Sequence, residues 1–194
     1  KIEDNLKLED TFSYLMPRRF AKELREILAD DDILTLDNGL YKVWIARNYP
    51  ARNPNTLLLD NALATMWAWY ASAMEAKRLS PDKKVVCVTW DGGLMMNLWD
   101  LETIVRLKLD IVIVVLNNHS YGMIKWKQQA QHFWDYGLDF ENPNFVKLAE
   151  SFGAKGYKVS DKNDFKPTLQ KALSETWLVI LDVDFEYPED GMIC

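Results

Sequence analysis

Two short polar segments contain the side chains that could bind a metal ion or a phosphate. Asp91-Gly92-Gly93 follows one apolar run, and Asn117-Asn118-His119 follows the next. A carboxylate and an amide oxygen suit Mg²⁺, which usually brings phosphate oxygens with it. Glycine N–H groups at the start of a helix can approach such a phosphate. The pattern indicates a magnesium–phosphate site, but spacing alone favours ordinary solvated turns, because short motifs of these residues recur by chance.

The two polar segments are positioned by apolar runs that are typical of buried parallel strands. Residues 85–89 and 111–116 are rich in β-branched side chains, the pattern of a strand covered on both faces. Further strands are expected at residues 33–37, 56–59, 157–159 and 178–183, and helices at 17–29, 62–79, 99–107, 144–152 and 165–173. This alternation predicts a three-layer α/β fold with a doubly wound, mainly parallel sheet of about six strands. Ligands of such folds bind at the carboxyl ends of the strands, where both polar segments lie.

Length and charge limit the domain organisation and the partners of the chain. Its 194 residues, with a net charge of −6 and 48% hydrophobic residues, predict one domain at residues 17–194 after a leader or linker at 1–16. The acidic balance argues against nucleic acid or an anionic membrane as a partner. No apolar segment reaches the roughly 18 residues of a membrane span. The 2 cysteines have no metal or disulfide spacing, which favours a reducing, cytoplasmic setting.

The polar segments also carry a family resemblance. Asp91-Gly92, followed after residues 93–116 by Asn117-Asn118, resembles the thiamine-diphosphate motif, in which GDG precedes NN at a fixed distance. The segments LETIVRLKLDIVIVVLNN, YGMIKWKQQ and NFVKLAESFGAKGYKV are similar to acetolactate-synthase-type enzymes. The resemblance runs from about Pro17 to the C-terminus and covers only their C-terminal, diphosphate-binding domain. It implies that the family's pyrimidine-binding domain is absent from this chain.

The resemblance implies which residues would hold Mg²⁺ and the diphosphate. The side chains of Asp91 and Asn118 and the carbonyl of Ser120 correspond to the metal ligands. The residues that would meet the diphosphate are Gly39, Tyr41, Gly92 and Gly93.

The same resemblance implies contacts to the rest of the cofactor and to the substrate. Met66 corresponds to a pyrimidine contact and Met96 to the apolar wedge that bends the cofactor. Trp126 falls where these synthases place a tryptophan beside the substrate pocket. As alternatives, the two methionines could fill the core, and Trp126 could be an ordinary residue of an amphipathic helix. The residues that follow the metal ligands, as in the family, are Tyr121, Gly122 and Met123.

Tryptophan stands at positions where the resembling enzymes have small residues. The chain has 8 tryptophans and only 8 glycines, whereas average usage would give roughly 14 glycines. Trp90 replaces the first glycine of GDG, and Trp99 stands where a small or polar residue faces the cofactor. Trp67 and Trp69 replace two glycines of a T-M-G-x-G-x-P loop. An indole brings roughly 150–250 Å² of surface that favours burial. We therefore expect these four side chains to pack together at the strand ends and to fill the cofactor site.

From these substitutions we expect an isolated, non-catalytic domain without a cofactor, present as a monomer or weak homo-oligomer. An engineered stable scaffold is favoured over natural drift, because several glycines are replaced by tryptophan together while the flanking strands keep the family pattern. One alternative is a half of a 2-oxo-acid synthase or decarboxylase that binds thiamine diphosphate and Mg²⁺ and needs a second domain or chain. Another is an interaction module whose tryptophans form the binding face. No catalytic residue is assigned.

Overall fold

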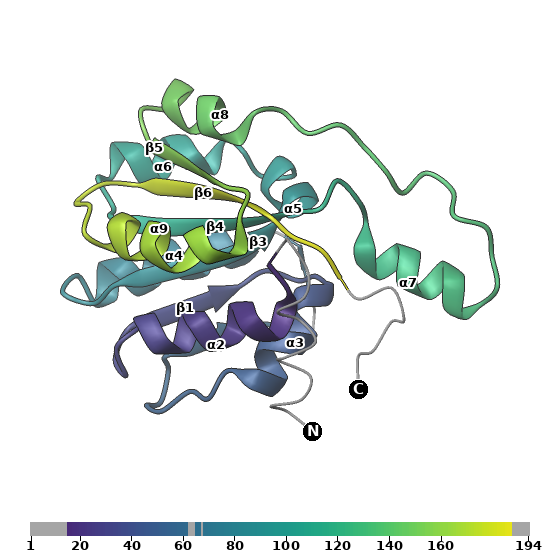
Figure 1. Cartoon of the computed structure of the whole chain (residues 1–194). Helices are drawn as coiled ribbons and strands as arrows, with labels where there is room; N and C mark the ends of the chain where they lie inside the picture. The colour runs from purple at the N-terminus through teal and green to yellow at the C-terminus, as the bar shows by residue number, and fades with distance from the viewer. Residues whose placement is uncertain (1–14, 62–64, 67, 188–194) are drawn as a thin grey trace.

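Six parallel strands form one sheet in the computed structural model, which describes residues 15–61, 65–66 and 68–187. All pairings between these strands are parallel. This confirms the predicted α/β fold, and within the described residues the sheet is wholly rather than mainly parallel. In spatial order the strands are β2 (Leu57–Leu59), β1 (Ile33–Leu36), β3 (Val85–Trp90), β4 (Ile111–Asn117), β6 (Val179–Asp184) and β5 (Lys155–Val159). Figure 1 labels the five strands from β1 to β5 in this order.

Helices cover both faces of the sheet and complete the three layers. Side chains alternate along a strand, so Val86 and Val88 of β3 face one apolar core, and Val85 and Cys87 face another. The first core is covered by α2 (Pro17–Ile27), α3 (Leu40–Asn48) and α9 (Phe165–Leu173), the last preceded by the 3₁₀ turn η1 (Lys162–Asp164). The second core is covered by α4 (Ala68–Leu79), α5 (Asp91–Met95), α6 (Asp100–Arg106) and α8 (Phe145–Ser151).

The order of the strands reverses between β1 and β3. After β1 the chain enters α3 on one face, whereas after β3 it enters α5 on the other face. The two neighbouring loops therefore diverge and leave a crevice at the strand ends, which is the usual ligand site of this architecture. Leu36 is paired with Val88, so that Asp37 and Trp90 both lie at this edge of the sheet.

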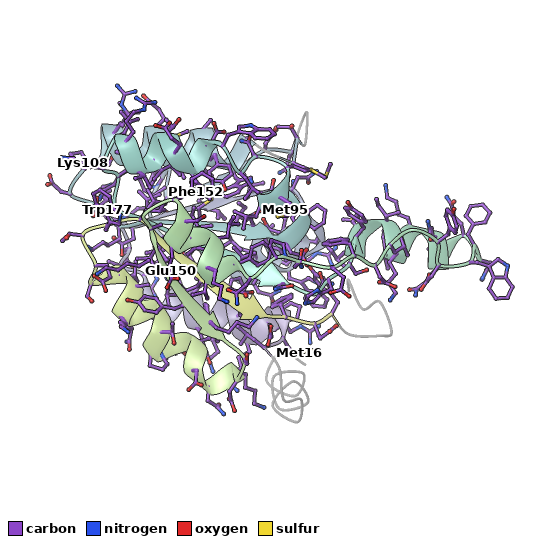
Figure 2. The ribbon with its side chains drawn as sticks, turned by 90° about the horizontal axis from the view of Figure 1, so that it is seen from above. Met16, Met95, Lys108, Glu150, Phe152 and Trp177 are labelled. Atoms are coloured by element: carbon purple, nitrogen blue, oxygen red, sulfur yellow. The ribbon has the colours of Figure 1, made fainter. Side chains whose placement is uncertain are left out.

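One helix stands apart from the layers. The helix α7 (Gly122–Ala130) projects beyond the carboxyl ends of the strands (Figures 1 and 2), and none of its residues is buried. We call the segment 121–138 the arm. An antiparallel bridge between Ser120 and Asp139 closes its base, together with a hydrogen bond of 3.0 Å from the N–H of Tyr121 to the carbonyl of Leu138.

Packing begins before the domain boundary expected at Pro17. Leu15 and Met16 are buried, and Leu15 forms a parallel bridge with Phe185. Leu15 belongs to the first core, so the last two residues of the expected leader pack with the domain. Residues 1–14 lie outside the described part of the chain. Within the described ranges, every helix is too short or too polar to cross a membrane.

Candidate functional site

A cavity of about 300 Å³ opens at the crevice between the ends of β1, β3 and β4. We call it the first cavity. Its walls come from the loops after β1 and β4, from the last residue of β3 and from the first turn of α7. The lining is mainly apolar. Among the residues that the resemblance assigns to the site, those that line this cavity are Gly39, Met66, Met96, Asn118, Ser120, Tyr121, Gly122 and Met123.

Trp90 ends β3 and forms one wall of the first cavity. Its side chain is 8% exposed, and its ring meets that of Tyr121 edge-on at 5.5 Å between centroids. Alternate residues of a strand share a face, so Trp90 points to the same side as Val86 and Val88. The indole therefore belongs to the first core, close to α3.

The indole of Trp90 packs against the three glycines that the resemblance assigns to the diphosphate. A β-carbon at Gly92 would lie 2.6 Å from the ring atom Cη2, and one at Gly93 would lie 2.8 Å from Nε1. A β-carbon at Gly39 would lie 3.1 Å from Cδ1 of the same ring. The bare backbone that these glycines present is thus covered by one side chain of the protein itself.

Asp91 is fully buried at the start of α5, and its carboxylate accepts hydrogen bonds from four N–H groups. Oδ1 accepts from the backbone of Gly92 at 2.8 Å. Oδ2 accepts from the backbone N–H groups of Asn118 (3.2 Å) and His119 (2.7 Å), and from the side-chain amide of Asn142 (2.8 Å). Burial raises the pKa of Asp91, while these hydrogen bonds act against the rise. The buried carboxylate therefore connects the end of β3 to the loop that follows β4.

A chain of polar side chains continues from Asp91 across the sheet. The amide of Asn142 also donates to Oδ1 of Asn117 at 2.9 Å, and the amide of Asn117 donates to Oδ1 of Asp182 at 2.9 Å. Nζ of Lys158 lies 3.1 Å from Oδ2 of Asp182. These hydrogen bonds link the side chain of Asn142 to both strand ends, which fixes the position of the loop before α8.

A second buried carboxyl group, that of Asp37, lies against Gly93 at the end of β1. Its Oδ2 accepts a hydrogen bond of 3.0 Å from the hydroxyl of Thr89, and burial raises the pKa of Asp37 to about 8. The hydroxyl of Tyr41 lies 2.8 Å from the carbonyl of Asp37 and 2.7 Å from that of Val88. Tyr41 is therefore held in the first core and does not line the cavity, in contrast to the diphosphate contact implied by the resemblance.

The expected cluster of tryptophans does not form among the described residues. Trp69 is buried in the core on the opposite face from Trp90, where it stacks on Tyr70 at 3.5 Å between ring centroids. Trp99 is 73% exposed, so the prediction that it fills the site is wrong. The physical reason is helical spacing: Leu101 and Ile104 turn the apolar side of α6 to the core, and a residue two positions before Leu101 faces away from it. Trp67 lies outside the described residues.

Sequence reasoning missed three residues that shape the site. Asn38 and Tyr187 line the first cavity, and Asn142 holds Asp91 from a position 51 residues away in the chain. The sequence Asp37-Asn38-Gly39 is typical of a turn, and this is the local signal that could mark the loop that carries Asn38. No local pattern marks Asn142 or Tyr187, because their roles depend on contacts between distant segments. Trp126 is half-buried and lines a second, neighbouring cavity.

Comparison with known proteins identifies the fold and the family. Residues 37–183 match the family described as thiamine pyrophosphate enzyme, C-terminal TPP binding domain. The chain belongs to this family. The acetolactate synthase of Bacillus subtilis is one similar relative. It is 34% identical to this chain over 174 residues, which are 90% of this chain and 30% of that protein. The putative thiamine pyrophosphate-containing protein YdaP of the same organism is 36% identical over 169 residues, which are 87% of this chain and 29% of that protein.

A solved structure shares the fold of this thiamine pyrophosphate enzyme domain. It is the thiamine diphosphate-dependent 4-hydroxybenzoylformate decarboxylase of Rhodococcus jostii RHA1, with a TM-score of 0.83 and 22% identity. The match covers 92% of this chain and 34% of the decarboxylase. The chain thus spans about a third of the length of the relatives it matches.

The residues at the strand ends, as they are arranged, do not fit the diphosphate of the family's cofactor with its metal ion. A diphosphate requires accessible N–H groups, and Mg²⁺ requires free oxygen ligands. Trp90 covers the glycines, and Oδ2 of Asp91 already accepts three hydrogen bonds. The neighbouring first cavity is apolar and lies at the lower end of the size range of ligand pockets.

Proposed function

We propose that this chain is a non-catalytic member of the thiamine pyrophosphate enzyme family. It keeps the fold of the cofactor-binding domain but, as it stands, binds neither thiamine diphosphate nor Mg²⁺. We propose further that it is a monomer or weak homo-oligomer and takes no nucleic acid as a partner.

The observation that carries this proposal is the position of the Trp90 indole. A single side chain lies on Gly39, Gly92 and Gly93, the residues through which the family resemblance would bring the backbone to a diphosphate. The indole is buried and packed against Tyr121, so moving it aside would expose a large apolar surface to water. An anionic ligand at these glycines must first displace this side chain.

The exposed aromatic side chains do not support the expectation of an engineered stable scaffold. Trp99 is 73% exposed and Trp134 is 93% exposed, whereas surfaces designed for stability carry few exposed tryptophans. We therefore propose only that the chain is non-catalytic and does not bind the cofactor, and we propose no engineered origin.

A second candidate function is favoured by the first cavity. Asn118, Ser120 and Met96 line it together, as expected for a domain that binds thiamine diphosphate and Mg²⁺ and works with a second domain or chain. In that case the cofactor would supply the carbanion chemistry, and these residues would only bind and orient it. The closed arrangement of Trp90 and Asp91 favours the first proposal over this one.

Calorimetric titration of the full chain with thiamine diphosphate and Mg²⁺ tests the proposal. We expect no saturable heat at micromolar concentrations, because the glycine backbone is covered. Micromolar binding that requires Mg²⁺ would contradict the proposal and favour the second candidate. The variant Trp90→Gly removes the covering indole, so we expect it to bind the cofactor more tightly than the parent chain does.

Chemical denaturation of the same Trp90→Gly variant tests whether the indole is part of the core. We expect the free energy of unfolding to fall by about 3–5 kcal/mol, as for other large-to-small changes of buried aromatic residues. Trp134→Gly is the matched control, because Trp134 is 93% exposed and its loss should change stability by no more than about 0.5 kcal/mol. Equal stability losses in the two variants would show that Trp90 is not packed as described.

A further inference from the structure

The loop between β1 and α3 contains the pair Asn38-Gly39, and no other asparagine in the sequence is followed by a glycine. The side-chain amide of an asparagine can be attacked by the backbone nitrogen of the next residue, which closes a five-membered ring. A β-carbon on that next residue hinders the approach, and glycine has none. Asn38 is therefore the asparagine at which this attack is least hindered.

The backbone nitrogen of Gly39 belongs to neither β1 nor α3. At the end of β1, the N–H of Asp37 donates to the carbonyl of Val88 at 2.9 Å. The helix begins with a hydrogen bond of 3.1 Å from the N–H of Lys42 to the carbonyl of Gly39. The Gly39 nitrogen lies between these two hydrogen bonds, so it can turn towards the side chain of Asn38 without breaking either of them.

Water, which is needed to open the ring, can reach Asn38 from two sides. The residue is half-buried and lines the first cavity. It also lines a third cavity, of about 410 Å³, which lies between β2 and the start of α4. The side chain of Asn38 is therefore close to solvent although the loop packs against the sheet.

The pair Asp91-Gly92 could form the same ring, but its surroundings oppose the reaction. Asp91 is fully buried, and its Oδ2 accepts three hydrogen bonds from within the protein. Ring formation would break these hydrogen bonds in a place where the freed groups meet no water. We therefore expect Asp91 to remain unchanged under conditions in which Asn38 reacts.

Packing requires glycine at position 39 and gives the reaction a structural consequence. A β-carbon there would lie 3.0 Å from Cε1 of Tyr41 and 3.1 Å from Cδ1 of Trp90, closer than carbon atoms normally approach. A larger residue, which would protect Asn38, therefore does not fit unless both rings move. An isoaspartate at position 38 adds one methylene to the main chain directly before Gly39, which displaces the glycine against the same two rings.

We propose that Asn38 is a site of spontaneous deamidation in the folded protein and that its isoaspartate product loosens the start of α3. The nitrogen of Gly39 attacks Cγ of Asn38, the N–Cγ bond forms, and the Cγ–Nδ2 bond breaks. The amide leaves as ammonia, with the proton that Gly39 gives up to the solvent. Water then opens the ring at one of its two carbonyl carbons, which yields aspartate or isoaspartate without oxidation or reduction. Either product places a negative charge on the wall of the first cavity.

Ageing of the full chain in warm, mildly alkaline buffer, followed by peptide mapping with mass spectrometry, tests the first part of this proposal. We expect Asn38 to lose its amide several-fold faster than Asn55, which is exposed and followed by Thr56. The variant Asn38→Gln should keep its amide at position 38, because the same attack would need a larger ring. An amide that is retained at Asn38 in the folded chain, or lost no faster than at Asn55, would overturn the proposal.

Urea unfolding of the separated products tests the second part. The isoaspartate form should unfold at a lower urea concentration than the unaged chain, because Gly39 no longer fits between Tyr41 and Trp90. The matched control is Asn38→Asp, which carries the new charge without the longer main chain and should unfold close to the unaged chain. Equal midpoints for the isoaspartate form and the unaged chain would overturn this part. The inference goes beyond the proposed function, so it stands even if thiamine diphosphate binds with Mg²⁺ at micromolar concentrations.

Discussion

Two side chains at the ends of β1 and β3 show how burial of single residues shapes the site. Trp90 and Asp37 both lie against Gly93, so the glycine backbone is enclosed by an indole on one side and a carboxyl group on another. Burial raises the pKa of Asp37 because the charged form loses its hydration, and the charge of Lys42 offsets only part of this effect. With a pKa of about 8, Asp37 holds its proton across much of the neutral range in the folded protein.

The raised pKa of Asp37 predicts a stability that depends on pH. Its folded-state pKa of about 8 lies above the ordinary value of 3.8, so the folded state keeps a proton that the unfolded state releases. The stability that this group contributes is fully present below about pH 4 and is lost as the pH rises towards 8. Between these two values the free energy of unfolding falls by about 1.4 kcal/mol per pH unit, and above pH 8 the group causes no further change. Urea unfolding of Asp37→Asn from pH 5 to pH 9 should show a smaller loss of stability than the parent chain shows.

The control for this prediction is Asp82→Asn, at an exposed carboxylate. Its pH profile should follow that of the parent chain. The informative quantity is the slope rather than the absolute stability, since an amide at position 37 also changes local hydrogen bonds. Parallel profiles for Asp37→Asn and the parent would show that Asp37 is ionised in the folded protein at neutral pH.

Single residues of the site differ in how far sequence could predict them. Asp91 and Asn118 follow buried apolar runs, so their place at the strand ends could be read from local pattern. The position of the Trp90 indole could not be read from local pattern, because it depends on the space over glycines in two separate loops. For Trp99 the family resemblance predicted a position in the cofactor site, and this was wrong. The spacing of Leu101 and Ile104, which face the core from α6, would have predicted that Trp99 faces solvent.

At the scale of elements, a buried ammonium group fixes α4 to the loops that precede β3 and β4. Nζ of Lys77 donates to the carbonyls of Pro81 (2.8 Å) and Lys83 (2.9 Å) and lies 3.0 Å from Oδ1 of Asp110. The side chain of Lys77 is 5% exposed. It therefore holds the loop between α4 and β3 against the loop that precedes β4.

Lys77→Met should destabilise the protein by about 3 kcal/mol, because it leaves Asp110 and two carbonyls without their partner. Thermal or urea unfolding measures this loss. Arg78→Met is the matched control, since Arg78 is on the surface and its nearest acidic oxygen, on Glu75, is 3.7 Å away. Its stability should change by no more than about 0.5 kcal/mol. A similar small change for Lys77→Met would mean that the buried ammonium group contributes little to the position of α4.

Elements with a strong local pattern were predicted, and elements without one were missed. The strands β3 and β4 are continuous buried runs, and their short length and many β-branched residues distinguish them from buried helices. Three helices near the site were not among the predicted ranges, although an amphipathic helix around Trp126 was left open as an alternative. The helix α5 has only 5 residues, α7 buries none of its residues, and α3 begins at Leu40 after Gly39, which has no side chain to cap it. Periodicity and capping, the usual signals of a helix, are weak in all three.

At the scale of the whole molecule, tryptophans divide into buried and exposed classes. Trp69 and Trp90 are buried in the two cores, whereas Trp99 and Trp134 are mostly exposed. Iodide should therefore quench part of the fluorescence. That quenchable part should shrink in Trp99→Phe/Trp134→Phe and persist in Trp69→Phe.

The same fluorescence measurement reports on self-association of the chain. The arm carries three exposed aromatic side chains, Phe133, Trp134 and Tyr136, and exposed apolar patches favour contacts between molecules. For the expected monomer or weak homo-oligomer, quenching should hardly change between dilute and concentrated solutions. A quenchable part that disappears with increasing concentration would indicate a stable oligomer that covers the arm.

The bridge between Ser120 and Asp139 has a consequence for how this protein can change over evolutionary time. The two ends of the arm meet at this bridge, so residues can be inserted or deleted within the arm at a small cost in chain entropy and without shifting any strand. Yet the first turn of α7 forms a wall of the first cavity, and Asp135 lies in the second. A change of length in one surface segment can therefore alter ligand selectivity while the sheet and both cores stay intact.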